Sequence, residues 1–180
     1  MIFLENIMIL TGNEIQNRLN KEIFIDPFNI EQVNPNSYNL SLSDELMIYT
    51  EEVLDPKKEN KTERIIIPKS GYILEPGKVY LARTSEYTKT FNLVPMIIGR
   101  SSLGRLGLAV HMTSGFGDVG FCGYWTMQLI CVQRMKIYSG MKICQIFYHT
   151  ICGDTINYNS DKYQNSKVVM ASKIFQEFND

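Results

Sequence analysis

The side chains best suited to chemistry gather in residues 99–128, which read GRSSLGRLGLAVHMTSGFGDVGFCGYWTMQ. Arg100, Ser101, Ser102 and Arg105 combine two guanidinium groups with two hydroxyls, and a guanidinium fork binds phosphate oxygens two at a time. Asp118 follows among glycines, where a carboxylate can approach a ligand closely. The pattern predicts a phosphate site, although an ordinary glycine-containing turn with solvated arginines fits the spacing equally well. The run matches neither the P-loop nor the dinucleotide fingerprint.

The composition predicts one globular domain with no general attraction to polyanions. A chain of 180 residues, 44% of them hydrophobic, is enough for a single domain with a sizeable core. The net charge of -1 gives no pull toward DNA, RNA or anionic membranes, so any phosphate binding must be local. No apolar run approaches a membrane span, and residues 1–7 carry no basic leader, so we expect a cytoplasmic protein.

The cysteine spacing gives little support to a metal site. Cys122, Cys131, Cys144 and Cys152 form no C-x-x-C pair, and zinc sites usually show such spacing. The H-x-E and P-C-x-x-C signature of zinc-dependent nucleobase deaminases is also missing from the sequence. We therefore expect no protein-held metal, and buried thiols that stay reduced.

Short strands separated by glycine and proline turns predict an all-β barrel or sandwich around these residues. One helix is expected at residues 11–20, where Thr11 and Glu14 form a capping-box pattern. The charged run 50–64 is expected to be a solvated loop or hairpin tip, residues 86–92 a polar turn of helix, and residues 135–148 a hairpin. The other strands are expected at residues 38–42, 65–68, 71–74, 78–84, 94–99 and 126–132.

In their order along the chain, these motifs resemble the dCTP deaminase family of the trimeric dUTPase-like superfamily. The central resemblance is GRSSLGRLGL, then V-H-x-T, then G-x-G-D-x-G-F-x-G and an apolar strand. Residues 8–15, 34–40, 140–146 and 162–163 extend it over nearly the whole chain. It implies a mainly β fold, a distorted β-barrel or jelly roll with a short N-terminal helix, which assembles as a homotrimer. Residues 157–180 would close over the site, and residues 1–7 would be an extension.

The resemblance also implies a role for individual residues. Ser101 and Arg105 would flank the reacting base, while Arg100 and Ser102 would face the phosphates. Asp118 would hold the deoxyribose, and Mg²⁺ would be carried by the triphosphate of dCTP or dUTP. The further substrate-binding residues implied are Thr113, Ser114, Phe121, Tyr158, Lys162 and Tyr163.

Position 128 departs from the family pattern, which carries a catalytic glutamate in a T-L-E-L strand. This chain reads T-M-Q-L there, with Gln128 in place of the glutamate. A carboxamide can hydrogen-bond a pyrimidine edge, but it cannot take a proton from water. Three functions stay open: a dCTP deaminase giving dUTP and ammonia, a catalytically silent protein that senses or sequesters a nucleotide, and a dUTPase-like pyrophosphatase using Asp118.

Overall fold

The structure is a computed structural model that describes residues 8–178 except 114, 157, 159 and 161. The predicted N-terminal helix forms but is shorter, with α1 spanning Gly12–Asn17. Thr11 is its N-cap, and the Thr11 hydroxyl accepts the Glu14 N–H at 3.2 Å. The chain leaves the helix through Asn20, whose φ of 59° suits asparagine, and enters β1, Ile23–Asp26.

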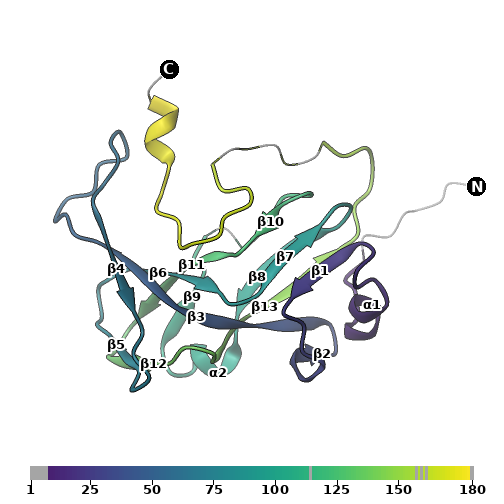
Figure 1. The fold of residues 1–180 in the computed structure, drawn as a ribbon, viewed down its shortest axis with the longest axis horizontal. Coiled ribbons are helices and arrows are strands. Elements are labelled where there is room, and N and C mark those ends of the chain that lie inside the picture. Colours follow the sequence, from purple (N-terminus) through teal and green to yellow (C-terminus); the bar gives the residue numbers. More distant parts are fainter. Residues whose placement is uncertain (1–7, 114, 157, 159, 161, 179–180) are drawn as a thin grey trace, which may run out of the picture.

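Most strands belong to one curled antiparallel sheet (Figure 1). They are β2 Val33–Asn34, β3 Ser37–Tyr49, β4 Thr62–Ile66, β6 Tyr80–Thr84, β8 Val94–Gly99, β9 Leu108–Val110, β11 Thr126–Cys131 and β13 Lys142–His149. The order in the sheet is β8–β13–β3–β6–β11–β9, and β2 and β4 pair with β3. Strand β8 has the predicted bounds, whereas β3 continues well beyond the expected end at residue 42.

The two edges of this sheet approach each other and nearly close a barrel. The carbonyl of Gly115, in the loop after β9, accepts the N–H of Ile97 in β8 at 2.7 Å. The carbonyl of Pro95 accepts the Gly117 N–H at 2.8 Å. These bonds occupy backbone groups that an open β8 edge would leave exposed, so the loop after β9 is fixed against the barrel wall.

A smaller sheet of β1, β7 (Tyr87–Thr90) and β10 (Cys122–Gly123) corrects one prediction. Residues 86–92 do not form a helical turn, because β7 pairs with β1 on one side and β10 on the other. Thr88 and Thr90 are buried in this strand, and β-branched side chains favour it. The polarity of the segment concealed a buried strand whose threonine hydroxyls face inward.

The predicted hairpin at residues 135–148 is also wrong. Strand β12, Met135–Ile137, pairs with β5, Tyr72–Leu74, in a separate two-stranded sheet. Strand β13 instead lies between β3 and β8. The turn between β12 and β13 is held against β3, because the Gly140 N–H donates to the Leu42 carbonyl at 2.8 Å. The two consecutive strands therefore belong to different sheets and do not pair with each other.

Short helical turns complete the described chain. They are η1 Ile30–Gln32, α2 Ser101–Gly104 between β8 and β9, and η2 Ile174–Phe178 near the C-terminus. Within the described residues, none of the helices has the length and apolar character needed to cross a membrane.

The core fills the barrel, and β11 shows how the strand period sorts its residues. Met127, Leu129 and Cys131 are buried in the core, while Thr126 and Gln128 alternate with them on the opposite face. The largest fully buried side chains include Tyr38, Tyr80 and Tyr148. Tyr148 and Tyr80 allow a test of how a buried tyrosine hydroxyl contributes to stability.

We expect Tyr148→Phe to leave the free energy of unfolding unchanged or to raise it by up to about 1 kcal/mol at pH 7. The buried Tyr148 hydroxyl has no hydrogen-bond partner among the described residues, so its removal leaves no new unpaired group. Urea denaturation measures the change. Tyr80→Phe is the matched control and should lose about 1 kcal/mol, because the Tyr80 hydroxyl accepts the Glu75 N–H at 3.0 Å.

The free energies of unfolding of the wild type and of Tyr148→Phe should diverge at alkaline pH. Burial, and then the neighbouring Tyr38, raise the pKa of Tyr148 above the ordinary tyrosine value. Its contribution is therefore complete below about pH 10, and it is lost above that pH as the unfolded chain ionises. The wild type should lose stability faster than Tyr148→Phe above about pH 10; parallel pH curves would contradict this assignment.

Candidate functional site

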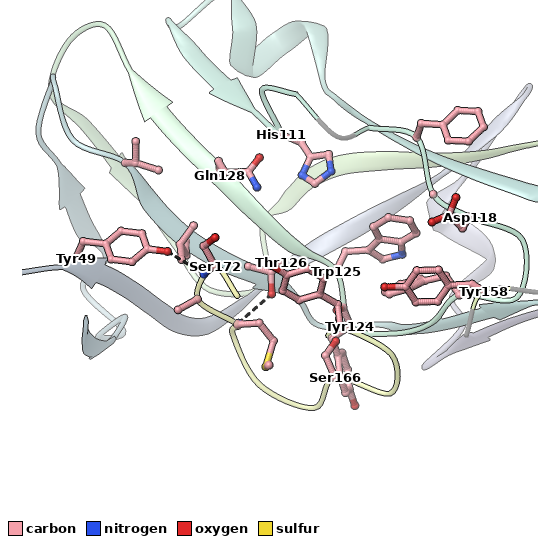
Figure 2. A pocket seen from close by; sticks show the side chains of 18 residues that line it. Tyr49, His111, Asp118, Tyr124, Trp125, Thr126, Gln128, Tyr158, Ser166 and Ser172 are labelled. Carbon is pink, nitrogen blue, oxygen red and sulfur yellow. Dashed lines mark hydrogen bonds between the residues drawn. The ribbon is translucent and has the colours of Figure 1, made fainter. Parts of the chain in front are cut away.

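A cavity of about 430 Å³ lies between the outer face of β11, the loop after β9 and the C-terminal segment. This volume is in the range of small-molecule sites. Eighteen residues line it, most of them apolar or aromatic, with a few polar side chains among them (Figure 2). Of the predicted site residues, the cavity brings together Asp118, Phe121, Gln128, Tyr158 and Tyr163.

Gln128 reaches the cavity because of the two-residue period of β11. Its side-chain oxygen is buried and has no hydrogen-bond partner among the described residues. A buried amide oxygen without a partner is costly in a folded protein. The oxygen is therefore available to a donor on a bound ligand.

His111 lies opposite Gln128, and the sequence reasoning had not singled it out. The β9–β11 register pairs Val110 with Leu129, and the His111 N–H then donates to the Gln128 carbonyl at 2.8 Å. The backbone of His111 has a φ of 61°, an uncommon conformation that histidine tolerates better than most residues. Its position within V-H-x-T is the signal that could have marked it.

Asp118 enters the cavity from the loop between β9 and β10. Its carbonyl accepts the Phe121 N–H at 3.1 Å, which makes a tight turn. Gly117 precedes it and packs against Trp125 so closely that an added Cβ would lie 2.4 Å from the indole ring. The exposed Asp118 carboxylate thus lies at the mouth of the cavity beside Tyr158 (Figure 2).

Aromatic rings form the wall between Asp118 and His111. The Phe121 and Trp125 ring centroids are 4.6 Å apart, and Tyr158 meets Phe121 edge-on at 6.0 Å. His111 meets Trp125 edge-on at 6.4 Å. The Trp125 indole N–H donates to the Thr88 hydroxyl at 2.8 Å, so the buried β7 threonine fixes the ring on which this wall rests.

The C-terminal segment lines one side of the cavity, and Figure 1 shows it beside β10 and β11. Six described residues line the cavity from this segment: Tyr158, Tyr163, Ser166, Met170, Ala171 and Ser172. The segment is attached by backbone N–H groups that donate to barrel hydroxyls. Met170 donates to Thr126 at 3.1 Å and Ser172 donates to Tyr49 at 2.8 Å, and Val169 is buried against Met47 and Leu81.

Two predicted ligand groups lie elsewhere in the single chain. Lys162 forms an ion pair with Glu177 of η2. Arg100, at the N-terminal end of α2, donates to the Lys142 carbonyl at 3.2 Å. Ser101, Ser102 and Arg105 are exposed, and α2 lies on the side of the barrel away from the C-terminal segment (Figure 1). None of these five residues lines the cavity of the described chain.

The other predictions concern Thr113, Ser114 and metal binding. Thr113 is exposed just after His111 and does not line the cavity, and Ser114 lies outside the described residues. Among the residues described, no group of three or more His, Cys, Asp and Glu side chains could hold a metal ion. Cys122, Cys131 and Cys144 are buried and Cys152 is exposed, all as free thiols.

A family profile described as dCTP deaminase-like matches residues 9–151. The chain belongs to the dCTP deaminase-like family. Two relatives named "dCTP deaminase, dUMP-forming" are similar over 171 residues, or 95% of this chain and 99% of each relative. The protein of Clostridium acetobutylicum is 57% identical, and that of Hathewaya histolytica is 58% identical.

A solved structure shows the family fold. The 2'-deoxycytidine 5'-triphosphate deaminase of Agrobacterium tumefaciens superposes with a TM-score of 0.63 at 18% identity, over 80% of this chain and 48% of that chain. At this identity the likeness concerns the fold alone. It confirms the predicted dUTPase/dCTP deaminase-like β-barrel, which here is nearly closed and antiparallel.

We expect Gly117→Ala to lower the free energy of unfolding by about 1–3 kcal/mol and to weaken nucleotide binding. The added methyl group would collide with Trp125 and with the Pro95 carbonyl, 2.9 Å away. Urea denaturation and calorimetry measure the two effects. Gly104→Ala is the control for stability, because no atom lies within 4 Å of its added Cβ; equal losses in both variants would contradict the close-packing explanation.

Proposed function

We propose that this chain is a dUMP-forming dCTP deaminase. The observation that carries the proposal is the similarity, over 95% of the chain, to relatives with that name. Conversion of dCTP into dUMP removes the 4-amino group and pyrophosphate, so it combines two of the three activities that the sequence left open. The similarity to these relatives also favours an enzyme over a catalytically silent nucleotide-binding protein.

The inner part of the cavity supports binding of a pyrimidine base. The buried Gln128 oxygen can accept a hydrogen bond from the cytosine 4-amino group, and the Gln128 amide N–H can donate to the ring. Phe121 and Trp125 offer apolar faces for the sugar and base. A ligand that pairs with the Gln128 oxygen would satisfy a polar atom that is otherwise buried alone.

The outer part of the cavity supports cleavage at the phosphates. Asp118 is the one carboxylate among the described residues that line the cavity. We assign it the activation of the water that attacks the α-phosphate, which releases pyrophosphate from the deaminated nucleotide. Mg²⁺ would enter with the triphosphate and neutralise part of its charge, with Asp118 as the nearest carboxylate in the site. A nucleotide-processing enzyme of this kind would work in the cytoplasm.

We further propose that the protein is a homotrimer whose sites are completed by neighbouring copies. Arg100, Ser101, Ser102 and Arg105 are suited to a triphosphate, yet α2 does not reach the cavity of its own chain. Exposed apolar side chains surround α2, with Ile98 at 56%, Leu106 at 54% and Val132 at 78% exposure. Their burial against a second copy would favour assembly and bring α2 to that copy's cavity.

The proposed reaction is tested by incubating the protein with dCTP and Mg²⁺ and following ammonia, pyrophosphate and nucleotides. We expect dUMP, with one ammonia and one pyrophosphate for each dCTP consumed. Accumulation of dUTP would show that the protein deaminates dCTP but does not cleave the α-phosphate, which would contradict the role assigned to Asp118. Unchanged dCTP with clear binding in calorimetry would overturn the deaminase function, and pyrophosphate release from dUTP alone would favour the dUTPase-like activity.

Mixing two inactive variants tests the shared site. Arg105→Ala damages the α2 side, and Asp118→Asn damages the cavity side. After the two are unfolded together and refolded, random trimers should contain about a quarter of intact dUMP-forming sites, since each intact site needs one good half from each variant. Activity that does not recover in the mixture, with both variants folded and trimeric, would show that one chain supplies its whole site.

A further inference from the structure

Deamination needs a proton carrier at the inner end of the cavity, and Gln128 cannot be that carrier. Replacing the cytosine amino group by oxygen moves two water protons, one to ring atom N3 and one to the departing amino group. A carboxamide neither accepts nor returns a proton near neutral pH. Building on the deaminase function proposed above, we propose that His111 is the proton-transfer group of this site.

The fold places His111 directly against Gln128. The antiparallel register that pairs Val110 with Leu129 continues to these two residues, which share the 2.8 Å bond between the His111 N–H and the Gln128 carbonyl. His111 itself lies one residue beyond the end of β9 and has a φ of 61°. Both side chains line the cavity, and Figure 2 shows the imidazole and the carboxamide entering it together.

The imidazole is also held in orientation. His111 meets Trp125 edge-on with ring centroids 6.4 Å apart. Trp125 is 6% exposed and its indole N–H is bound to the Thr88 hydroxyl at 2.8 Å. A proton carrier works best when packing fixes its position before the substrate arrives.

The other titratable side chains around the cavity are less suited to the task. In the described lining these are Asp118, Tyr49, Tyr124, Tyr158 and Tyr163. Tyrosines ordinarily ionise near pH 10, and the hydroxyls of Tyr49 and Tyr163 already accept backbone N–H groups. Asp118 lies at the mouth beside Tyr158 (Figure 2). Imidazole, by contrast, exchanges protons readily near neutral pH.

The reaction balances with His111 as the only carrier. As the water oxygen bonds to C4, one water proton passes to the imidazole, which delivers it to N3 as the C4–N3 π electrons move to N3. The remaining proton on the new hydroxyl then passes to the imidazole and on to the 4-amino group. The C4–N bond breaks with its electrons on nitrogen, so ammonia leaves and the C4=O bond of uracil forms. Gln128 would hold the amino group throughout.

The first test is His111→Asn, because asparagine tolerates the φ of 61° at this position. We expect kcat for ammonia release from dCTP to fall about 10²–10⁴-fold, with nucleotide affinity changed only a few-fold. In the wild type, kcat/KM should fall on the acid side of neutrality, where a histidine base is protonated, and this limb should vanish in the variant. Wild-type activity and pH profile in His111→Asn would overturn the proposal.

The matched control is His149→Asn, since His149 is the second of the chain's two histidines. His149 ends β13, pairs with Val94 and does not line the cavity. Its variant should keep the wild-type rate and the acid limb. If the acid limb disappears with His149 instead, the limb does not report His111 and the proposal fails.

A second variant separates proton transfer from a structural role. In the His111→Asn background, Gln128→Glu supplies a carboxylate at the neighbouring position and should restore ammonia release at least tenfold. If His111 only shaped the cavity, Gln128→Glu would change ammonia release by the same factor in the wild type and in His111→Asn. A wild type that releases no ammonia from dCTP would overturn the deaminase function itself, which is distinct from a wild type that deaminates equally well without His111.

Discussion

The site depends on one strand, β11, having two different faces. Its inward residues, Met127, Leu129 and Cys131, belong to the barrel core, so the strand cannot shift its register without exposing them. The same constraint fixes Thr126 and Gln128 on the cavity face. The core thus determines where the amide of Gln128 lies, and the neighbouring β9 edge determines where His111 lies.

The C-terminal segment also contacts this strand, because the Met170 N–H donates to the Thr126 hydroxyl of β11. Three of its backbone N–H groups donate to the side chains of Thr126, Tyr49 and Glu45. Asn165 and Ser166 add backbone hydrogen bonds beside β10, and Val169 is its buried apolar anchor. Each such bond contributes only about 1 kcal/mol. The segment is therefore held by several individually weak hydrogen bonds and one buried side chain.

The fold class, and five of the eighteen residues that line the cavity, could be predicted from sequence because motifs and strand period are local signals. The bounds of β8 and the Thr11 cap are examples. Pairing partners were less predictable. The polar sequence of β7 predicts a turn of helix, and its strand is recognised only when β1 and β10 pair with both its edges. The chain also gives no local sign that β12 pairs with β5.

The central motif is where sequence reasoning and geometry differ most. Arg100 to Asp118 looks like one continuous site along the chain, but β9 carries the chain from α2 to the far side of the barrel wall before the Asp118 loop begins. A contiguous motif can therefore serve two separate surfaces of one protomer. In the proposed homotrimer, the two surfaces from neighbouring copies would bind the same nucleotide.

Within the cavity, two kinds of chemistry are separated by aromatic rings. Phe121 and Trp125 lie between the Asp118 end and the His111–Gln128 end. In the proposal made above, Gln128 would recognise the base at the inner end, and His111 on the neighbouring chain segment would transfer the protons there.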